Sequence, residues 1–155
     1  MAQYAFANGI SAILQVTCSF WDNHAVKHLE PRAAWAAIQQ TANALFIDVR
    51  MEIESLYVGR PPGAQNIPWY EYPDMQTHPA QFVHIVEREA GDKTRPVFLI
   101  CRSGKRTVDA GEALEAAGFT NVTNILHGFE GELDEGFHRS KISGWRFDGL
   151  PWEQM

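Results

Sequence analysis

Short apolar runs alternate along the chain with segments in which apolar residues recur at helical spacing. The apolar runs, which we expect to be buried strands, cover residues 45–49, 97–100 and 122–126. The segments with helical spacing cover residues 31–40, 79–90 and 107–117, and a single helical turn is expected over residues 52–57. Strands that alternate with helices predict an α/β domain with a central, mostly parallel sheet and helices on both faces.

The two ends of the chain do not follow this alternation. Residues 1–28 show no convincing period, and we interpret them as an N-terminal extension of unclear role ahead of a domain over residues 29–155. Cys18 lies in this extension, and we favour a bystander there over a second sulfur-handling thiol. The tail over residues 144–152 is rich in aromatic side chains, and we expect it to pack against the core.

Two of the expected strands end in residues that carry chemistry. Asp48 and Arg50 stand at the end of one strand, and Cys101 directly follows another. Ligands of parallel α/β sheets bind beyond the carboxyl ends of the strands, so these residues should share one edge. We expect Asp48 and Arg50 on opposite sides, with Asp48 bracing the loop after Cys101 and Arg50 facing the ligand. A surface ion pair is the alternative for these two residues.

The loop over residues 102–106 joins the Cys101 strand to the next helix. Backbone N–H groups at a helix start lack intrahelical partners and attract anions. Arg102, Lys105 and Arg106 add three cations, which we expect to be exposed. Because cations and a helix N-terminus favour the thiolate form of cysteine, Cys101 is expected to act as a nucleophile and not as an inert core residue.

Composition limits the classes of partner. The chain has 155 residues, 45% of them hydrophobic, and a net charge of −6, which argues against nucleic acid or an anionic membrane as partner. Positive charge is concentrated in the Cys101 loop, which favours a small anionic ligand. Two cysteines make no disulfide framework, and without a targeting signal we expect a cytoplasmic protein. The six histidines lack metal-ligand spacing, so no metal or other cofactor is expected.

Three stretches together resemble a known family. The chain reads I-D-V-R from residue 47, P-G-A-Q-N-I-P from residue 62 and C-R-S-G-K-R-T from residue 101. In order and spacing they are similar to the opening signature and the active-site loop of rhodanese domains, over roughly residues 29–129. Two departures are His127, where a second glycine is common, and Arg60-Pro61 in place of the usual His-Ile.

The resemblance implies sulfurtransferase chemistry. In this reading Cys101 takes a sulfane sulfur from an anionic donor such as thiosulfate, holds it as a persulfide and passes it to cyanide or a thiol, which includes a protein thiol as partner. No cofactor is implied. The residues that would bind donor and persulfide are Arg50, Arg102, Ser103, Gly104, Lys105, Arg106 and Thr107.

Two alternatives remain open at this point. Cysteine phosphatases of similar architecture place five residues between cysteine and arginine and a histidine before the cysteine. Here four residues separate Cys101 from Arg106, and Ile100 precedes the cysteine, so the loop encloses a smaller anion. The other alternative is a sulfur carrier or docking module with little turnover of small molecules, although docking modules of this family usually lack the cysteine.

Overall fold

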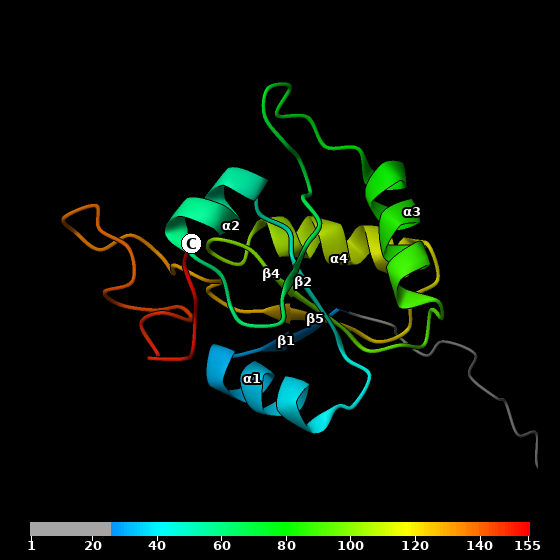
Figure 1. Cartoon of the computed structure of the whole chain (residues 1–155), viewed down its shortest axis with the longest axis horizontal. Helices are drawn as coiled ribbons and strands as arrows, with labels where there is room; N and C mark the ends of the chain where they lie inside the picture. Colours follow the sequence, from blue (N-terminus) through cyan, green and yellow to red (C-terminus); the bar gives the residue numbers. More distant parts are fainter. Residues whose placement is uncertain (1–25) are drawn as a thin grey trace, which may run out of the picture.

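The computed structural model describes residues 26–155, in which a five-stranded, all-parallel sheet lies between layers of helices (Figure 1). The strand order is β1-β5-β4-β2-β3. The strands are β1 (Lys27–Leu29), β2 (Leu45–Asp48), β3 (Gln65–Asn66), β4 (Val97–Ile100) and β5 (Val122–Ile125). The helices are α1 (Pro31–Gln40), α2 (Glu52–Val58), α3 (Pro79–Ala90) and α4 (Arg106–Ala116).

The elements expected from the sequence are confirmed to within one or two residues. Pro31 and Pro79 each begin a helix, where a missing N–H is not needed, and Gly91 ends α3 with a positive φ of 72°. The pattern missed the edge strands β1 and β3 because runs of two or three residues are too short to show a period. The boundary expected at residue 28 falls inside β1, and Cys18 lies outside the described residues.

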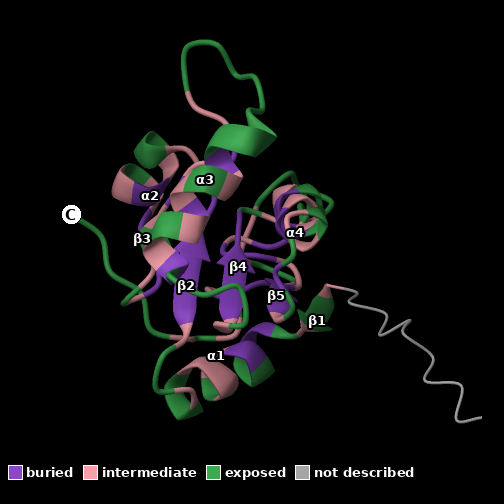
Figure 2. Cartoon of the chain, turned by 90° about the vertical axis from the view of Figure 1, so that its right-hand side faces the viewer, coloured by how far each residue is buried: buried purple, intermediate pink, exposed green. Residues whose placement is uncertain are grey.

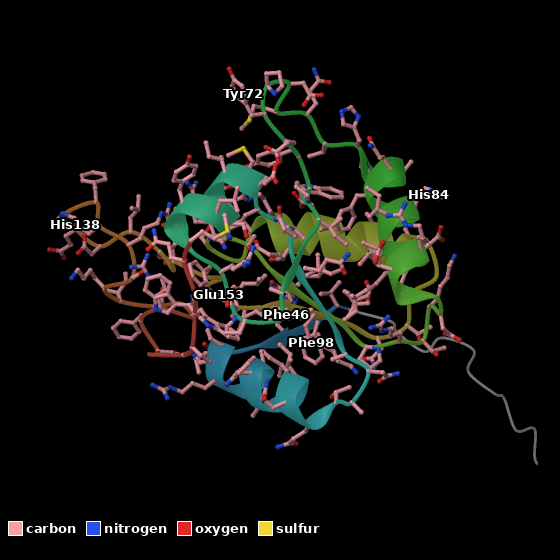
Figure 3. All side chains as sticks on the ribbon, viewed as in Figure 1. Phe46, Tyr72, His84, Phe98, His138 and Glu153 are labelled. Carbon is pink, nitrogen blue, oxygen red and sulfur yellow. The ribbon has the colours of Figure 1, made fainter. Side chains whose placement is uncertain are left out.

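The strands separate two apolar cores, because side chains alternate between the two faces of a strand. On one face, Val97 and Leu99 of β4 belong to a cluster that includes side chains of α3 and α4. On the other face, Phe98 belongs to a cluster with side chains of α1 and of the C-terminal tail. Figure 2 shows the central strands buried on both faces, and Figure 3 shows Phe46 and Phe98 between the sheet and α1.

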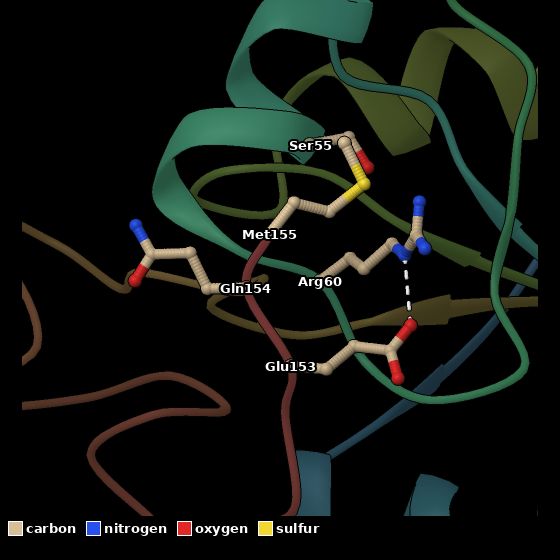
Figure 4. A pocket seen from close by; sticks show the side chains of 5 residues that line it. All are labelled: Ser55, Arg60, Glu153, Gln154 and Met155. Carbon is tan, nitrogen blue, oxygen red and sulfur yellow. Dashed lines mark hydrogen bonds and ion pairs between the residues drawn. The ribbon is translucent and has the colours of Figure 1, made fainter.

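Part of the C-terminal tail packs, as expected, against the apolar core that contains Phe98. Trp145 is fully buried, with its ring centroid 5.4 Å from that of Trp35, whereas Phe147 is half exposed. Farther along, Glu153 pairs with Arg60 in an isolated antiparallel bridge. The chain then lines a hollow of about 240 Å³ beside α2, with Ser55, Arg60, Glu153, Gln154 and Met155 around it (Figure 4). None of the helices in residues 26–155 is long and apolar enough to cross a membrane.

Candidate active site

Cys101 is the first residue after β4, and the loop that follows it curls around its sulfur. The side chain is almost fully buried, and the Gly104 N–H donates a hydrogen bond to Sγ at 3.1 Å. The Thr107 hydroxyl lies 3.6 Å from the same sulfur. Gly104 has a φ of 85°, and a Cβ there would lie 3.0 Å from the backbone nitrogen of His127. Glycine at this position therefore allows the loop to turn its N–H towards the sulfur.

The chain after β5 holds the loop from the opposite side. The Phe129 N–H donates to the Cys101 carbonyl at 2.7 Å, and the Glu130 N–H donates to the Arg102 carbonyl at 2.9 Å. The approach is so close that a Cβ on Gly128 would lie 2.3 Å from the Cys101 carbonyl oxygen. Cys101 and Arg102 are thus fixed by backbone bonds to a segment that is distant in sequence.

The three loop cations differ in their surroundings. Arg102 and Lys105 are exposed, as expected. Arg106 is not: its side chain is 12% exposed, and its guanidinium donates to both carboxylate oxygens of Glu54 at 2.7 and 2.8 Å. It also lies 5.2 Å from the centre of the Tyr70 ring. The expectation of exposure was wrong for Arg106 because α2 presents a carboxylate to it, which the loop sequence alone does not reveal.

Glu54 and Arg106 stabilise one another's charged forms. Burial raises the pKa of Glu54, but hydrogen bonds from Arg106 and the Met51 N–H, together with the charge of Arg106, outweigh it and lower the pKa below its ordinary value. Burial likewise lowers the pKa of Arg106, whereas Glu54 and, to a smaller extent, Cys101 raise it, and the net shift is upward. The pair therefore stays ionised at neutral pH beside the loop.

This pair makes stability depend on pH in the acid range. The pKa of Glu54 is lower in the folded than in the unfolded chain. Its contribution to the free energy of unfolding is therefore complete above about pH 4.5 and is lost as the pH falls through the pKa of the folded state. We expect the free energy of unfolding of the wild type to fall more steeply on acidification below pH ~4.5 than that of Glu54→Gln. Urea unfolding at several pH values measures this, and parallel curves for the two proteins would contradict it.

Asp48 and Arg50 are placed differently from the expectation. Both side chains are fully buried, and they bind each other, with Nη2 of Arg50 2.6 Å from Oδ2 of Asp48. Arg50 also donates to the Gly59 carbonyl at 2.7 Å, and its guanidinium lies 4.4 Å from the centre of the Phe129 ring. The chain stays paired one residue past β2, through the Val49 N–H bond to Ile100, and side chains two residues apart in extended chain point the same way, so the expectation of opposite sides was wrong.

The consequence is a structural role for this pair. The Asp48 carboxylate accepts hydrogen bonds from Arg50, including its backbone N–H at 3.1 Å, and does not brace the Cys101 loop directly. Arg50 does not face a ligand at the sheet edge, because no part of it is exposed. It instead joins the end of β2 to the residue after α2 and to the segment that holds the loop.

The structure adds neighbours that the sequence did not indicate. Thr107, expected near the persulfide, also donates to the Oδ1 atom of Asn124 on β5 at 2.6 Å. A hollow of about 270 Å³ beside the loop is lined by Ser103, Lys105, Glu132, Leu133 and Arg139. Three of these residues lie in the segment after residue 130, outside the stretches that resemble the family, so no motif located them. Within residues 26–155, no group of three or more His, Cys, Asp or Glu side chains is arranged to hold a metal ion.

The fold and the site define an α/β protein with a cysteine between a central parallel strand and a helix, where one loop N–H donates to the sulfur. The chain belongs to the rhodanese family, because the model of the Rhodanese-like domain matches residues 30–134. The crystal structure of Rv0390 from M. tuberculosis is 34% identical, with a TM-score of 0.74, and the match covers 84% of this chain and 99% of that one.

Curated relatives are more distant in sequence. The thiosulfate sulfurtransferase GlpE of Actinobacillus succinogenes is 28% identical over 129 residues, which cover 83% of this chain and 92% of that protein. The uncharacterized protein RC0915 of Rickettsia conorii is 28% identical over 134 residues, which cover 83% of this chain and 98% of that protein. The chain is thus a rhodanese-like domain with distant sulfurtransferase relatives.

Proposed function

We propose that this protein is a sulfurtransferase that moves sulfane sulfur from an anionic donor such as thiosulfate to cyanide or a thiol through a persulfide on Cys101. The observation that carries the proposal is the Gly104 N–H, which donates to the Cys101 sulfur at 3.1 Å inside a loop that ends at a helix start. The name of the 28% identical relative, a thiosulfate sulfurtransferase, supports the same activity. A thiol that must stay reduced suits the cytoplasm.

The chemistry proceeds in two displacements. The Cys101 thiolate attacks the outer sulfur of thiosulfate, a new sulfur–sulfur bond forms, and sulfite leaves with the electron pair of the bond that breaks. An acceptor nucleophile then attacks the outer sulfur of the persulfide, and the thiolate of Cys101 leaves in its original state. The loop N–H groups stabilise the charged sulfur in both steps, and exposed Arg102 and Lys105 attract the dianionic donor.

Intact-mass spectrometry tests this proposal. Incubation with thiosulfate is expected to add one sulfur atom to the protein, and later addition of cyanide should remove it as thiocyanate. Glutathione persulfide and mercaptopyruvate, tested in parallel, identify the donor class, and the cationic loop favours the dianion. A protein that remains unmodified with all three donors would refute the proposal.

Assays on the same purified protein distinguish a sulfurtransferase from a phosphatase and from a sulfur carrier. Faster release of phosphate from an aryl phosphate than of thiocyanate from thiosulfate and cyanide would favour a phosphatase. A protein that gains sulfur but gives it up to protein thiols and only slowly to cyanide would be a sulfur carrier. The almost complete burial of Cys101 and the short loop support transfer of a small group, a single sulfur atom.

The two loop arginines should give separable defects. Arg102→Ala is expected to raise the thiosulfate concentration for half-maximal rate severalfold while changing the free energy of unfolding by no more than about 0.5 kcal/mol, because the side chain is exposed. Arg106→Ala should slow transfer and also destabilise the protein by about 1–3 kcal/mol, since Glu54 loses its partner.

A matched control is Arg88→Ala on α3, where the side chain is exposed and pairs with the adjacent Glu89. This variant should retain wild-type kinetics and stability. Steady-state kinetics and urea unfolding on the three variants measure the difference. Equal stability of the Arg106 and Arg102 variants would contradict the assignment of Arg106 to the Glu54 pair.

A further inference from the structure

A line of polar side chains runs from the Cys101 sulfur to the edge of the sheet. The Thr107 hydroxyl, 3.6 Å from the sulfur, donates to Oδ1 of Asn124 at 2.6 Å. The Asn124 Nδ2 atom lies 3.0 Å from Nδ1 of His28. Strand register explains the alignment, because His28 and Asn124 are paired residues of β1 and β5, and Asn124 is paired with Leu99 of β4, two residues before the cysteine.

Burial restricts the partners available to this line. Thr107 and Asn124 are 0% and 1% exposed, so they depend on one another for hydrogen bonds, whereas His28 is exposed and exchanges protons with solvent. The charged neighbours of His28 along the chain are engaged elsewhere: Lys27 donates to Asn121 at 3.1 Å, and Glu30 lies 3.6 Å from His127. His28 is therefore the end of the line that solvent reaches.

We propose that Asn124 and His28 set the direction of the Thr107 hydroxyl bond and thereby control how readily Cys101 becomes the reactive thiolate. The proposal deepens the proposed function, since the thiolate is the species that attacks the donor. Thr107 touches the reacting sulfur, and Asn124 and His28 are positioning residues that act through it.

The influence of Asn124 on the thiol follows from the number of hydrogens on the Thr107 hydroxyl. A threonine hydroxyl has one hydrogen, which it gives either to Asn124 or to the sulfur. When the Asn124 oxygen faces Thr107, as in the structure, the hydrogen goes to the amide, and the hydroxyl presents lone pairs to the sulfur. That arrangement suits a neutral thiol, whose hydrogen the hydroxyl then accepts.

Reversal of the amide gives the opposite arrangement. The two ends of an amide side chain have nearly the same shape, so Asn124 fits with Nδ2 towards Thr107. Nδ2 then donates to the hydroxyl, which donates its hydrogen to the sulfur and stabilises a thiolate or persulfide. The Asn124 oxygen now faces His28, which must carry its proton on Nδ1, whereas the first arrangement requires Nδ1 to be an acceptor. The three side chains therefore reverse together.

Alkylation of Cys101 by iodoacetamide tests this coupling, because it reports the thiolate and needs no sulfur donor. Thr107→Val is expected to slow alkylation by about tenfold or more, the factor expected for a lost hydrogen bond to a charged group, and Thr107→Ser should keep the wild-type rate. Asn124→Leu should accelerate it by roughly two- to tenfold, because the hydroxyl is no longer drawn away from the sulfur.

The double variant separates control through the hydroxyl from a structural role. In the Thr107→Val background, Asn124→Leu should leave the alkylation rate unchanged. Slower alkylation in Asn124→Leu alone, or the same change in both backgrounds, would overturn the proposal. A merely structural asparagine predicts those results, because loss of packing would disturb the loop whether or not the hydroxyl is present.

Imidazole ¹⁵N NMR provides a second measurement that leaves Asn124 intact. The fraction of His28 that carries a proton on Nδ1 should be larger in the wild type, with Cys101 as thiolate, than in Cys101→Ser, whose neutral hydroxyl donates as a thiol does. Thr107→Val should remove that difference. Equal fractions in the wild type and Cys101→Ser would overturn the proposal. If these results appear but thiosulfate adds no sulfur, the proposed function fails and the coupling stands.

Discussion

Cys101→Ser is expected to abolish sulfur transfer, with a loss of at least about 10⁴-fold in rate, the order seen when a covalent nucleophile is removed. A serine hydroxyl remains protonated at neutral pH and cannot hold sulfur as a persulfide. The side chain is buried at the end of β4 and accepts one loop N–H, which an oxygen also accepts, so folding should be retained. Thiocyanate formation and intact mass after incubation with thiosulfate both measure the loss.

The other cysteine provides the matched control. Cys18→Ser removes the second of the two thiols in the chain and should leave both the gain of one sulfur and the rate of thiocyanate formation unchanged. A circular dichroism spectrum identical to that of the wild type would establish that Cys101→Ser is folded. If the persulfide persists in Cys101→Ser and disappears in Cys18→Ser, the sulfur is carried by Cys18, and our assignment of the chemistry to Cys101 is refuted.

Arg50→Met is expected to lower the free energy of unfolding by about 3–5 kcal/mol, because it leaves the Asp48 carboxylate buried without its partner. Asp48 and Arg50 are both 0% exposed, and methionine replaces much of the apolar stem of the arginine but not its charged end. Since whole domains are stable by only about 5–15 kcal/mol, this is a large fraction of the total. Urea unfolding followed by circular dichroism measures the change.

Two further variants show whether the effect comes from the buried charge. Arg60→Met breaks a more exposed pair with Glu153 and should cost no more than about 1 kcal/mol. The double variant Asp48→Leu/Arg50→Met removes both buried charges and should recover much of the lost stability. A double variant less stable than Arg50→Met alone would show that the pair contributes through something other than mutual neutralisation.

The sequence was sufficient to predict the elements on either side of Cys101. The apolar run before Cys101, the change to helical spacing after Thr107 and the three cations between them are local signals, and the structure places β4, the loop and α4 accordingly. A parallel sheet follows from the same alternation, because parallel strands need helical connections. The resemblance to rhodanese domains added the family, which the match of the Rhodanese-like domain to residues 30–134 confirms.

What the sequence did not reveal are contacts between segments far apart in the chain. Glu54 and Arg106 are 52 residues apart, and their pairing depends on how α2 packs beside the loop. In the sequence, Asn124 is one position within an apolar run that predicts a strand. Its bond to Thr107 exists only because β5 packs against α4. Asp48 and Arg50 were visible as charges, but their burial depends on the segments that close over them.

One departure from the family pattern acquires a physical meaning. His127 replaces a commonly found glycine, and its φ of 62° is in the left-handed region that glycine adopts without strain. Its Nε2 atom lies 3.6 Å from a carboxylate oxygen of Glu30, so the side chain gains a partner that glycine lacks. The backbone at this position therefore keeps a conformation that suits glycine, while the side chain makes an ion-pair contact.

The Phe129 amide, bonded to the Cys101 carbonyl at 2.7 Å, makes the rigidity of the site observable. The segment that carries this amide follows β5 closely, so the bond ties the Cys101 loop to the sheet while β5 stays paired with β4. Exchange of this amide with deuterium should then require opening of the sheet and proceed at a rate near that of global unfolding. The Cys101 loop would be assembled once, during folding, and would keep its conformation throughout the proposed transfer of sulfur.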